Sequence, residues 1–375
     1  MGKSSKDKRD AYYRLAKEQN WRARSAFKLI QIDEQFDLFS YQEPSQCTRV
    51  VDLCAAPGSW SQVLSRVLIK GESFGRRAWV EKMSKLQRQD HSESVETGLS
   101  QLRVDDEEEA SKLLCPRKNV KIVAIDLQPM APLEGITQLK ADITHPSTVP
   151  LLLKALDPAF DETNAQHRVD LVICDGAPDV TGLHDLDIYI QAQLLHSALA
   201  LATKVLRPGG KFVAKIFRGR NVDLIYAQLK TVFERVHVAK PRASRASSIE
   251  AFVVCEGFTP IDGWTPSIGN SMHAPEPTQF SNKQTRRTLQ DDGITEVIFD
   301  DDEVDPRRWI APFIACGDLS AWDSDATYKL PAGHVSLPPV QPPTAPPYKA
   351  AIERRRVEGG AYGKTKDRSK QTGTS

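Results

Sequence analysis

The sequence predicts an α/β domain in which helices cover both faces of a mostly parallel sheet. Short apolar runs rich in β-branched residues alternate with longer stretches whose apolar residues recur at helical spacing. The short runs are continuously apolar, as is typical of strands buried on both faces of a parallel sheet. The chain has 375 residues, of which 40% are hydrophobic, so it can form one large core and still carry extensions. This pattern indicates a doubly wound architecture.

The expected elements follow one another between about residue 20 and residue 258. Helical spacing is found in three stretches, which are residues 59–68, 187–206 and 221–236. Pro208 and the two glycines after it are expected to end the second of these helices. Strands are expected at 50–55, 121–127, 169–175, 210–217 and 250–258.

The remaining segments differ from this domain in composition. We divide the chain into a basic N-terminal segment at 1–20, the α/β domain at 21–258, a Pro-rich and acidic C-terminal arm at 259–356 and a disordered basic tail at 357–375. Residues 71–118 separate the first two strands and are polar with mixed charge. We therefore expect an insertion of low order that contains a short helix and protrudes from the domain surface.

Charge is balanced in total but sorted by segment. The chain has 50 Lys and Arg against 49 Asp and Glu, a formal net charge of +1, which taken alone argues against a nucleic-acid partner. However, residues 1–28 have a net charge of +6 and residues 207–245 a net charge of +8, whereas 289–305 hold eight acids and no base. Charge acts within a Debye length of roughly 10 Å, so the total hides basic regions that suit a polyanion.

Cysteine spacing and hydropathy exclude several classes. None of the six cysteines falls in a CxxC pair, so neither a zinc site nor a disulfide framework is predicted. No run approaches the roughly 18 apolar residues that a membrane span needs, and the N-terminus lacks the apolar region of a signal peptide. We expect a soluble, cytoplasmic protein without a metal or a membrane partner.

The segment VDLCAAPGSW (51–60) predicts a nucleotide site. It has the pattern of a strand, a Pro-Gly turn and a helix, and in doubly wound folds the turn after the first strand binds nucleotides. Gly58 is the residue expected to let the backbone approach the ligand. The sequence has neither GxGxxG nor a Walker motif, so pyrophosphate binding is poorly supported. An adenosine-type ligand without phosphates fits better, and S-adenosylmethionine (SAM) is the commonest such cofactor on this kind of fold.

Acidic residues at three further strand ends support this interpretation. Asp126 ends the second strand, where a carboxylate can accept hydrogen bonds from both ribose hydroxyls. Asp142 lies at the next strand end, near the expected adenine, and Asp175 lies at the switch point, where a carboxylate would favour a cationic sulfonium. Any one of these acids could simply cap a turn. The ordered set is better explained by a SAM site.

Seven motifs in order along the chain carry a family resemblance. They are RSAFKLIQID, VDLCAAPGSW, VAIDLQPM, ADIT, DLVICDGAPDVTG, LRPGGKFVAKIFRG and SSIEAFVVCEGF. In these blocks the chain resembles the FtsJ-like (RrmJ-type) RNA ribose 2′-O-methyltransferases. The resemblance implies a Rossmann-like class I SAM-dependent methyltransferase fold, whose seven-stranded sheet has one antiparallel strand. It also implies a catalytic tetrad, which corresponds here to Lys28, Asp175, Lys215 and Glu250.

These residue types suit methyl transfer to a ribose. A 2′-hydroxyl is a weak nucleophile, so its oxygen must be aimed at the methyl group and its proton must leave. The resemblance implies that Lys215 is the base or the hydroxyl-orienting group. Asp175 would orient Lys215 and face the sulfonium, while Lys28 and Glu250 would position the ribose. We expect burial and the second ammonium to lower the pKa of Lys215.

The alternatives for single residues differ in strength. Lys28 and Lys215 taken alone would be solvated surface lysines, but Lys215 lies in the apolar run FVAKIF, where an unpaired ammonium is costly. Glu250 could be an edge charge. Trp60 could be a core aromatic or a cofactor contact, and the family pattern favours the contact.

The two basic segments flank the expected catalytic lysines. In the first, Tyr12, Tyr13 and Trp21 are interleaved with Arg and Lys, a combination that suits stacking on unpaired bases and binding of phosphates. In the second, Arg242 and Arg245 are expected to contact the RNA backbone. Two such segments around a methyl-transfer site predict an RNA track.

The ends of the domain indicate a branch of the family. Residues 7–29, 312–331 and 342–356 resemble the eukaryotic tRNA branch. The resemblance implies methylation of the wobble nucleotide of the tRNA anticodon loop and of the nucleotide two positions before it. It also implies two auxiliary proteins, a WD-repeat protein for the wobble site and a large helical-repeat protein for the other. We expect the arm at 259–356 to be their docking surface.

Two other classes remain open. An rRNA 2′-O-methyltransferase of the same family would methylate ribosomal subunits and not tRNA. A non-catalytic RNA-binding scaffold on a methyltransferase fold would not bind SAM, and the intact tetrad argues against it. A nicotinamide enzyme is a more distant alternative because GxGxxG is missing.

Overall fold

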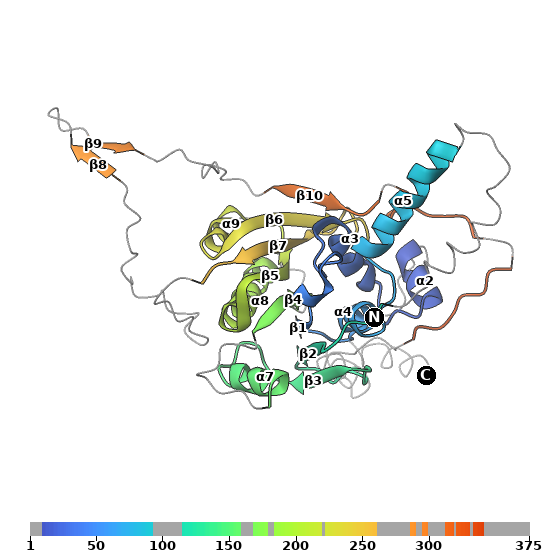
Figure 1. Ribbon diagram of the computed structural model, residues 1–375, viewed down its shortest axis with the longest axis horizontal. Helices are drawn as coiled ribbons and strands as arrows, with labels where there is room; N and C mark the ends of the chain where they lie inside the picture. The colour runs from blue at the N-terminus through green and yellow to red at the C-terminus, as the bar shows by residue number, and fades with distance from the viewer. Residues whose placement is uncertain are drawn as a thin grey trace, which may run out of the picture.

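The fold is an eight-stranded sheet with helices on both faces (Figure 1). The computed structural model describes residues 10–92, 115–158, 168–178, 184–219, 222–260, 286–289, 295–298, 312–318, 320–330 and 333–340. The strand order is β10-β6-β7-β5-β4-β1-β2-β3. The strands of this sheet are β1 (Arg49–Leu53), β2 (Lys121–Asp126), β3 (Ile136–Lys140), β4 (Val169–Cys174), β5 (Leu206–Phe217), β6 (Phe233–Pro241), β7 (Glu250–Phe258) and β10 (Phe313–Cys316).

The topology confirms the predicted sheet and adds one strand to it. Seven strands come from the domain expected at 21–258, and β7 is antiparallel to both of its neighbours, while the other paired strands are parallel. The eighth strand, β10, comes from the expected arm and pairs with β6. A separate hairpin consists of β8 (Arg286–Leu289) and β9 (Thr295–Ile298).

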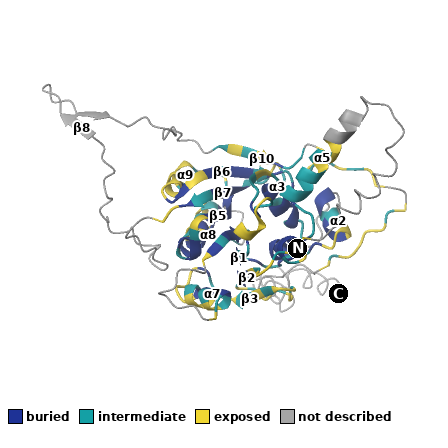
Figure 2. Cartoon of the chain, viewed as in Figure 1, coloured by how far each residue is buried: buried dark blue, intermediate teal, exposed yellow. Residues whose placement is uncertain are grey.

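Two hydrophobic clusters show which helices cover which face. Leu152 of α7 (Thr148–Leu156), Leu201 of α8 (His184–Val205) and Leu229 of α9 (Val222–Lys230) belong to one cluster. Tyr12 of α2 (Ala11–Glu18) and Leu29 of α3 (Ala26–Phe36) belong to the other, together with α4 (Ser59–Leu64) and its continuation η2 (Ser65–Ile69). The strands between these layers are largely buried (Figure 2). The doubly wound architecture is therefore confirmed.

The prediction of a helix at 221–236 is wrong for the second half of that range. Helix α9 ends at Lys230, and the chain turns at Thr231 and continues as β6. Phe233 and Val236 are three residues apart, as on one face of a helix, yet both are buried side chains of strand β6. Pairing with β7 and β10 supplies backbone hydrogen bonds that a sequence pattern does not reveal.

Part of the expected insertion is regular. Residues 71–92 and 115–118 are described, and they contain α5 (Arg76–Ser92), a helix of 17 residues rather than a short one. The carboxylate of Asp33 in α3 accepts a hydrogen bond from the Arg76 N–H at the start of this helix, at 2.8 Å. Residues 93–114, for which low order is expected, lie outside the described residues, as does the tail at 357–375.

All six cysteines are free thiols, and Cys47, Cys174, Cys255 and Cys316 are buried as small apolar side chains. Over the described ranges, no three His, Cys, Asp or Glu side chains are grouped so as to hold a metal ion. No helix in those ranges is long and apolar enough to cross a membrane.

Candidate active site

The strand order creates a switch point between β4 and β1. From β1 the chain proceeds outward to β2 and β3 and then returns to β4 on the other side of β1. In open α/β sheets the crevice at the carboxyl ends of these strands is where ligands bind. Asp175 follows β4 directly, so the structure places it at this crevice.

The four residues of the expected tetrad lie in one cluster. Lys215 lies within β5, and Glu250 is the first residue of the antiparallel strand β7, so the start of β7 meets the carboxyl end of β5. Lys28 lies in the first turn of α3 and reaches the same edge. Four elements thus bring together residues that are far apart in the sequence.

Two lysines and two carboxylates form a continuous ion-paired group. The Lys28 ammonium lies 2.6 Å from Glu250 Oε1, and the Lys215 ammonium lies 3.4 Å from Glu250 Oε2. Lys215 also pairs with the Asp175 carboxylate and donates to the Asp175 carbonyl oxygen at 3.0 Å. Ser244, which the sequence did not single out, donates its hydroxyl to Glu250 Oε1 at 2.7 Å. Lys215 is only 7% exposed, so the group is shielded from bulk water.

The electrostatics of this cluster differ from the expectation. Burial lowers the pKa of Lys28, and the nearby Lys215 charge adds to this effect. Burial acts in the same direction on Lys215, but Asp175 and Glu250 outweigh it and raise the pKa of Lys215. The expected lowering is therefore wrong for Lys215 and applies to Lys28. The two lysines together hold the pKa of Glu250 below its usual value, despite burial.

The turn after β1 requires a glycine at position 58. Gly58 has φ +94°, and a Cβ there would lie 2.6 Å from Arg22 Nη1 and from Met130 Sδ. Asp126, at the end of β2, accepts hydrogen bonds from the Ala56 N–H at 2.8 Å and from the Gln128 N–H at 2.7 Å. The expected ribose ligand Asp126 thus also fixes the turn.

Asp142 follows β3 by two residues and caps the next turn, with the Thr144 N–H and hydroxyl donating to its Oδ1 at 2.8 and 2.7 Å. Trp60 lies in the core, 2% exposed, where its ring packs on Phe252 and its Nε1 donates to Ser25 O at 2.8 Å. Trp60 therefore has the core role that the sequence left open. Its contact with a cofactor stays a prediction.

Asp52 is a further acid at this site that sequence reasoning missed. It is fully buried in β1, and its Oδ2 accepts from the Ser61 hydroxyl at 2.5 Å, while its Oδ1 has no hydrogen-bond partner among the described residues. Burial, with the nearby charges of Asp175 and Asp126, raises the pKa of Asp52 to about 7. A carboxylate oxygen that lacks a partner, close to the charges of Asp126 and Asp175, fits a site for a cationic nucleoside with hydroxyl donors, as SAM is.

Arg22 is another residue whose role the sequence did not reveal. Its guanidinium donates to Pro57 O at 3.2 Å, in the turn after β1, and to Ala131 O and Pro132 O at 2.9 Å each, in the segment after β2. Arg22 therefore ties the two loops of the expected cofactor site together. No local motif could have indicated this, because the three acceptors are backbone carbonyls.

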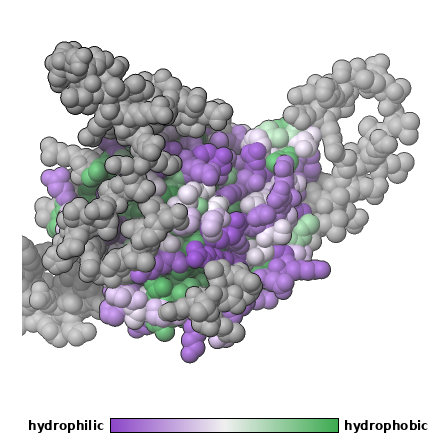
Figure 3. Space-filling view, turned by 60° about the vertical axis from the view of Figure 1, so that its left-hand side comes forward, coloured by the Kyte–Doolittle hydropathy of each residue, from purple (hydrophilic) through white to green (hydrophobic). Residues whose placement is uncertain are grey.

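The expected aromatic platform for RNA bases is wrong for two of its three residues. Tyr12 and Trp21 are 2% and 1% exposed, so neither ring can stack on a base. Tyr13 is partly exposed and carries the Lys17 ammonium 4.5 Å from its ring centre. Arg245 pairs with the buried Asp10 at 3.1 Å and so has a structural role. The surface seen in Figure 3 is nonetheless mainly hydrophilic over the described residues.

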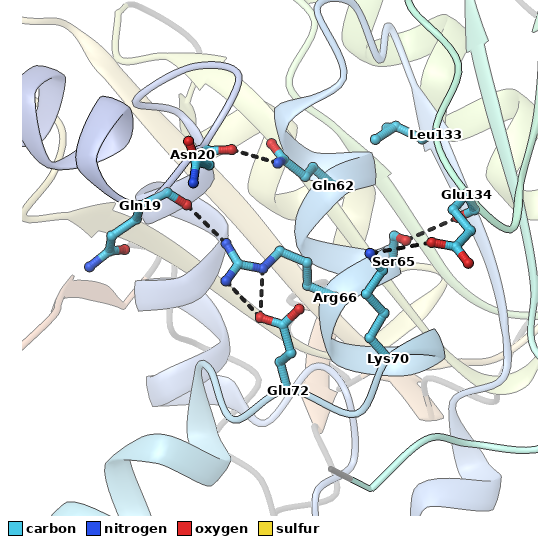
Figure 4. A pocket seen from close by; sticks show the side chains of 9 residues that line it. All are labelled: Gln19, Asn20, Gln62, Ser65, Arg66, Lys70, Glu72, Leu133 and Glu134. Atoms are coloured by element: carbon cyan, nitrogen blue, oxygen red, sulfur yellow. Dashed lines mark hydrogen bonds and ion pairs between the residues drawn. The ribbon is translucent and has the colours of Figure 1, made fainter. Parts of the chain in front are cut away.

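A pocket of about 270 Å³ lies beside α4 and η2 and not at the tetrad (Figure 4). Its charged side chains pair with one another, Arg66 with Glu72 at 2.6 Å and Lys70 with Glu134 at 3.3 Å. Its lining residues are Gln19, Asn20, Gln62, Ser65, Arg66, Lys70, Glu72, Leu133 and Glu134.

Known proteins are similar to this chain over most of its length. The family described as FtsJ-like methyltransferase matches residues 21–258. A tRNA (cytidine(32)/guanosine(34)-2′-O)-methyltransferase of Schizosaccharomyces pombe is 48% identical over 355 residues, which cover 94% of this chain and 97% of the relative. A human protein of the same name is 45% identical over 95% of this chain and 86% of its own length. A pre-rRNA 2′-O-ribose RNA methyltransferase of Pongo abelii is 34% identical over 70% of this chain but 24% of its own length.

Proposed function

The chain belongs to the FtsJ-like methyltransferase family, and from this premise we propose that it transfers the methyl group of SAM to the ribose 2′-hydroxyls of tRNA nucleotides 32 and 34 in the anticodon loop. The observation that carries the proposal is the buried cluster of Lys28, Asp175, Lys215 and Glu250 at the switch point of the sheet, next to the turn at Gly58. Relatives named for tRNA support the substrate, since their similarity extends over the arm as well as the domain.

The residues of the cluster have distinct roles in this proposal. SAM, when bound, supplies a methyl group activated by its sulfonium. Asp126, Asp142 and Gly58 hold its nucleoside, and the acidic groups at the switch point favour its positive charge. Lys215 aims the 2′-oxygen at the methyl group, and it takes the hydroxyl proton in the fraction of molecules in which it is neutral. Asp175 and Glu250 keep that fraction small by raising the pKa of Lys215, so the rate should rise with pH.

The direct test removes the Lys215 ammonium. Lys215→Ala should bind SAM as the wild type does and lose methyl transfer by about 100-fold or more, because both the orientation and the proton acceptor are gone. Calorimetry measures SAM binding, and labelled SAM measures transfer to tRNA. Lys211→Ala is the matched control on the same strand, where the ammonium bonds to the Asp37 carbonyl instead. Full activity of Lys215→Ala would contradict the assignment.

The rRNA alternative is tested with the substrate. Labelled SAM is offered to total tRNA and to purified ribosomal subunits, and the modified ribose is mapped. The proposal expects label in tRNA at the anticodon loop, and label confined to ribosomal subunits would overturn it. The scaffold alternative predicts that calorimetry detects no SAM binding.

We also propose that separate auxiliary proteins, a WD-repeat protein and a large helical-repeat protein, direct the enzyme to its two nucleotides. Their docking surface is the arm at 259–356, in a cytoplasmic enzyme whose product supports translation. The family resemblance and the acidic, Pro-rich composition of the arm support this proposal. It is tested by measuring methylation at each nucleotide with and without each auxiliary protein.

A further inference from the structure

Gln191 of α8 contacts the backbone of two tetrad strands at once. Its side chain is 3% exposed, and its amide nitrogen donates to Gly176 O at 3.1 Å and to Lys215 O at 2.9 Å. Gly176 directly follows the tetrad residue Asp175, and the second carbonyl belongs to the tetrad residue Lys215 itself. One side chain therefore connects the backbone that carries both members of an ion pair.

The position of these contacts explains what they do. The parallel pairing of β4 with β5 proceeds in register as far as Cys174 and Ala214. Beyond that point β4 has ended, so no backbone hydrogen bonds between β4 and β5 hold the two segments at a fixed separation. The Gln191 amide links the two segments by hydrogen bonds where the strand pairing stops.

Helix α8 is held firmly enough to serve as the support. Ile188, Gln191 and Leu194 are three residues apart and so lie on one face of the helix. A Cβ on Gly219 would meet Ile188 at 2.8 Å, and a Cβ on Gly176 would meet Leu194 at 2.9 Å. The turns on either side of Gln191 therefore pack closely against the same two segments that its amide bonds.

A glutamine amide suits this place. It has two N–H donors, and both carbonyls are acceptors, so the nitrogen must face them. The Oε1 is buried without a hydrogen-bond partner among the described residues, and rotating the amide would turn this oxygen toward two carbonyl oxygens. The amide is thus fixed in one orientation.

We propose that Gln191 is a positioning residue for methyl transfer, which holds the Asp175 carboxylate and the Lys215 ammonium in register by bonding the backbone of both segments. The proposal rests on the catalytic role given above to Lys215. A shift of about 1 Å between reacting groups costs on the order of 100-fold in rate, so loss of this link should be visible in kcat.

The test compares two identical substitutions on one helix. Gln191→Met keeps the length of the side chain and removes the donors, whereas Gln193→Met makes the same change two residues further on. Gln191→Met should lower kcat by about 10- to 100-fold, with the SAM Kd and the tRNA KM within about twofold of the wild type. Gln193→Met should keep the wild-type kcat. A folded Gln191→Met enzyme with wild-type kcat would overturn the proposal.

The pH profile of kcat/KM distinguishes a positioning role of Gln191 from a purely structural role. If Asp175 moves away from Lys215, the pKa of Lys215 falls, because Asp175 is the largest of the influences that raise it. The rising limb of kcat/KM in Gln191→Met should therefore move to lower pH, whereas a purely structural defect would scale the profile without moving it. If Gln191→Met does not fold, Gln191→Asn keeps the amide but is one methylene shorter, and the same two results are expected of it. Wild-type protein that methylates no tRNA even with both auxiliary proteins present would instead contradict the proposed function.

Discussion

Glu250 pairs with both lysines of the cluster, so a change at Glu250 affects two ammonium groups. Its charge raises the pKa of both Lys28 and Lys215. Glu250→Gln keeps the shape of the side chain and an oxygen for the Ser244 hydroxyl, but removes the charge. Because an opposite charge at this range shifts a pKa by about 1–3 units, the pKa of Lys215 should fall by at least about one unit. A larger fraction of Lys215 is then neutral at a given pH.

The prediction is that the rising limb of kcat/KM moves to lower pH in Glu250→Gln, so that kcat/KM begins to level off at alkaline pH where that of the wild type still rises. Kinetics from about pH 7 to about pH 11 measure this difference. Glu256→Gln is the control on the same strand, since Glu256 pairs with the exposed Arg235. A limb at the wild-type pH in Glu250→Gln would show that Glu250 does not set the pKa of Lys215.

At the same scale, the sequence predicts which residues form the site better than it predicts their neighbours and their burial. Motif order was enough to name Lys28, Asp175, Lys215 and Glu250, which the structure brings together. It could not indicate that Lys215 sits between two carboxylates, because that depends on how β5 and β7 pair. In the same way, Tyr12 resembles a surface aromatic in the sequence, and its burial depends on packing against segments far along the chain.

At the scale of elements, the contact of α3 with α5 depends on a buried acid. Asp33 is 1% exposed, and its carboxylate accepts from the N–H groups of Phe39 at 2.9 Å and Arg76 at 2.8 Å. Burial outweighs these bonds and raises the pKa of Asp33 from 3.8 to about 7. The folded chain therefore retains a proton that the unfolded chain loses near pH 4. Stability is lost as the pH rises between these two values, since the unfolded state then binds fewer protons.

The prediction is that Asp33→Asn flattens this pH dependence. The substitution keeps the side-chain shape and removes the titration. As the pH rises from about 4 to about 7, the free energy of unfolding of Asp33→Asn should therefore increase relative to that of the wild type by up to about 1.4 kcal/mol per pH unit. Urea unfolding at about pH 5 and about pH 7.5 measures it. Glu43→Gln, at an exposed site, should keep the wild-type dependence. Parallel curves for wild type and Asp33→Asn would contradict the role of Asp33.

Elements were predictable where local pattern and tertiary environment agree. The strand expected at 250–258 has the same bounds as β7, since a continuous apolar run fits a strand buried on both faces. The second half of the helix expected at 221–236 failed because helical spacing at Phe233 and Val236 coincides with pairing to distant strands. The short strand β10 has no strong pattern of its own and depends on the exposed edge of β6.

At the scale of the whole molecule, described residues of the arm between 312 and 325 contact the catalytic domain. The Tyr12 hydroxyl donates to Trp322 O at 2.7 Å, and Asp325 accepts from the Ala246 N–H at 2.6 Å. Lys82 of α5 pairs with Asp318. The arm thus contacts α2, α5 and the loop that leads into Glu250.

This arrangement predicts different results for two truncations. A chain that ends at 311 loses β10, whose segment accepts hydrogen bonds from the Val238 N–H at Pro312 O (2.8 Å) and from the Arg242 N–H at Cys316 O (2.9 Å). A chain that ends at 340 keeps these contacts. The shorter chain should melt several degrees lower, since about 1 kcal/mol corresponds to about 2–4 °C in a domain of this size. Hydrogen exchange should be faster at Val238 and Arg242 in the shorter chain alone.

The same two truncated chains also test whether SAM binding and methyl transfer depend on different edges of the sheet. β10 lies at one edge, and β2 and β3, whose ends form the expected cofactor site, lie at the other. SAM binding should therefore survive in the chain that ends at 311, while methyl transfer falls, because the loop that carries Ser244 and leads into Glu250 has lost its support. Calorimetry and labelled-SAM transfer measure the two effects on the same preparations. Equal melting temperatures and equal exchange in the two chains would show that the arm does not stabilise the domain, and its contacts with the loop would then have no part in holding the tetrad.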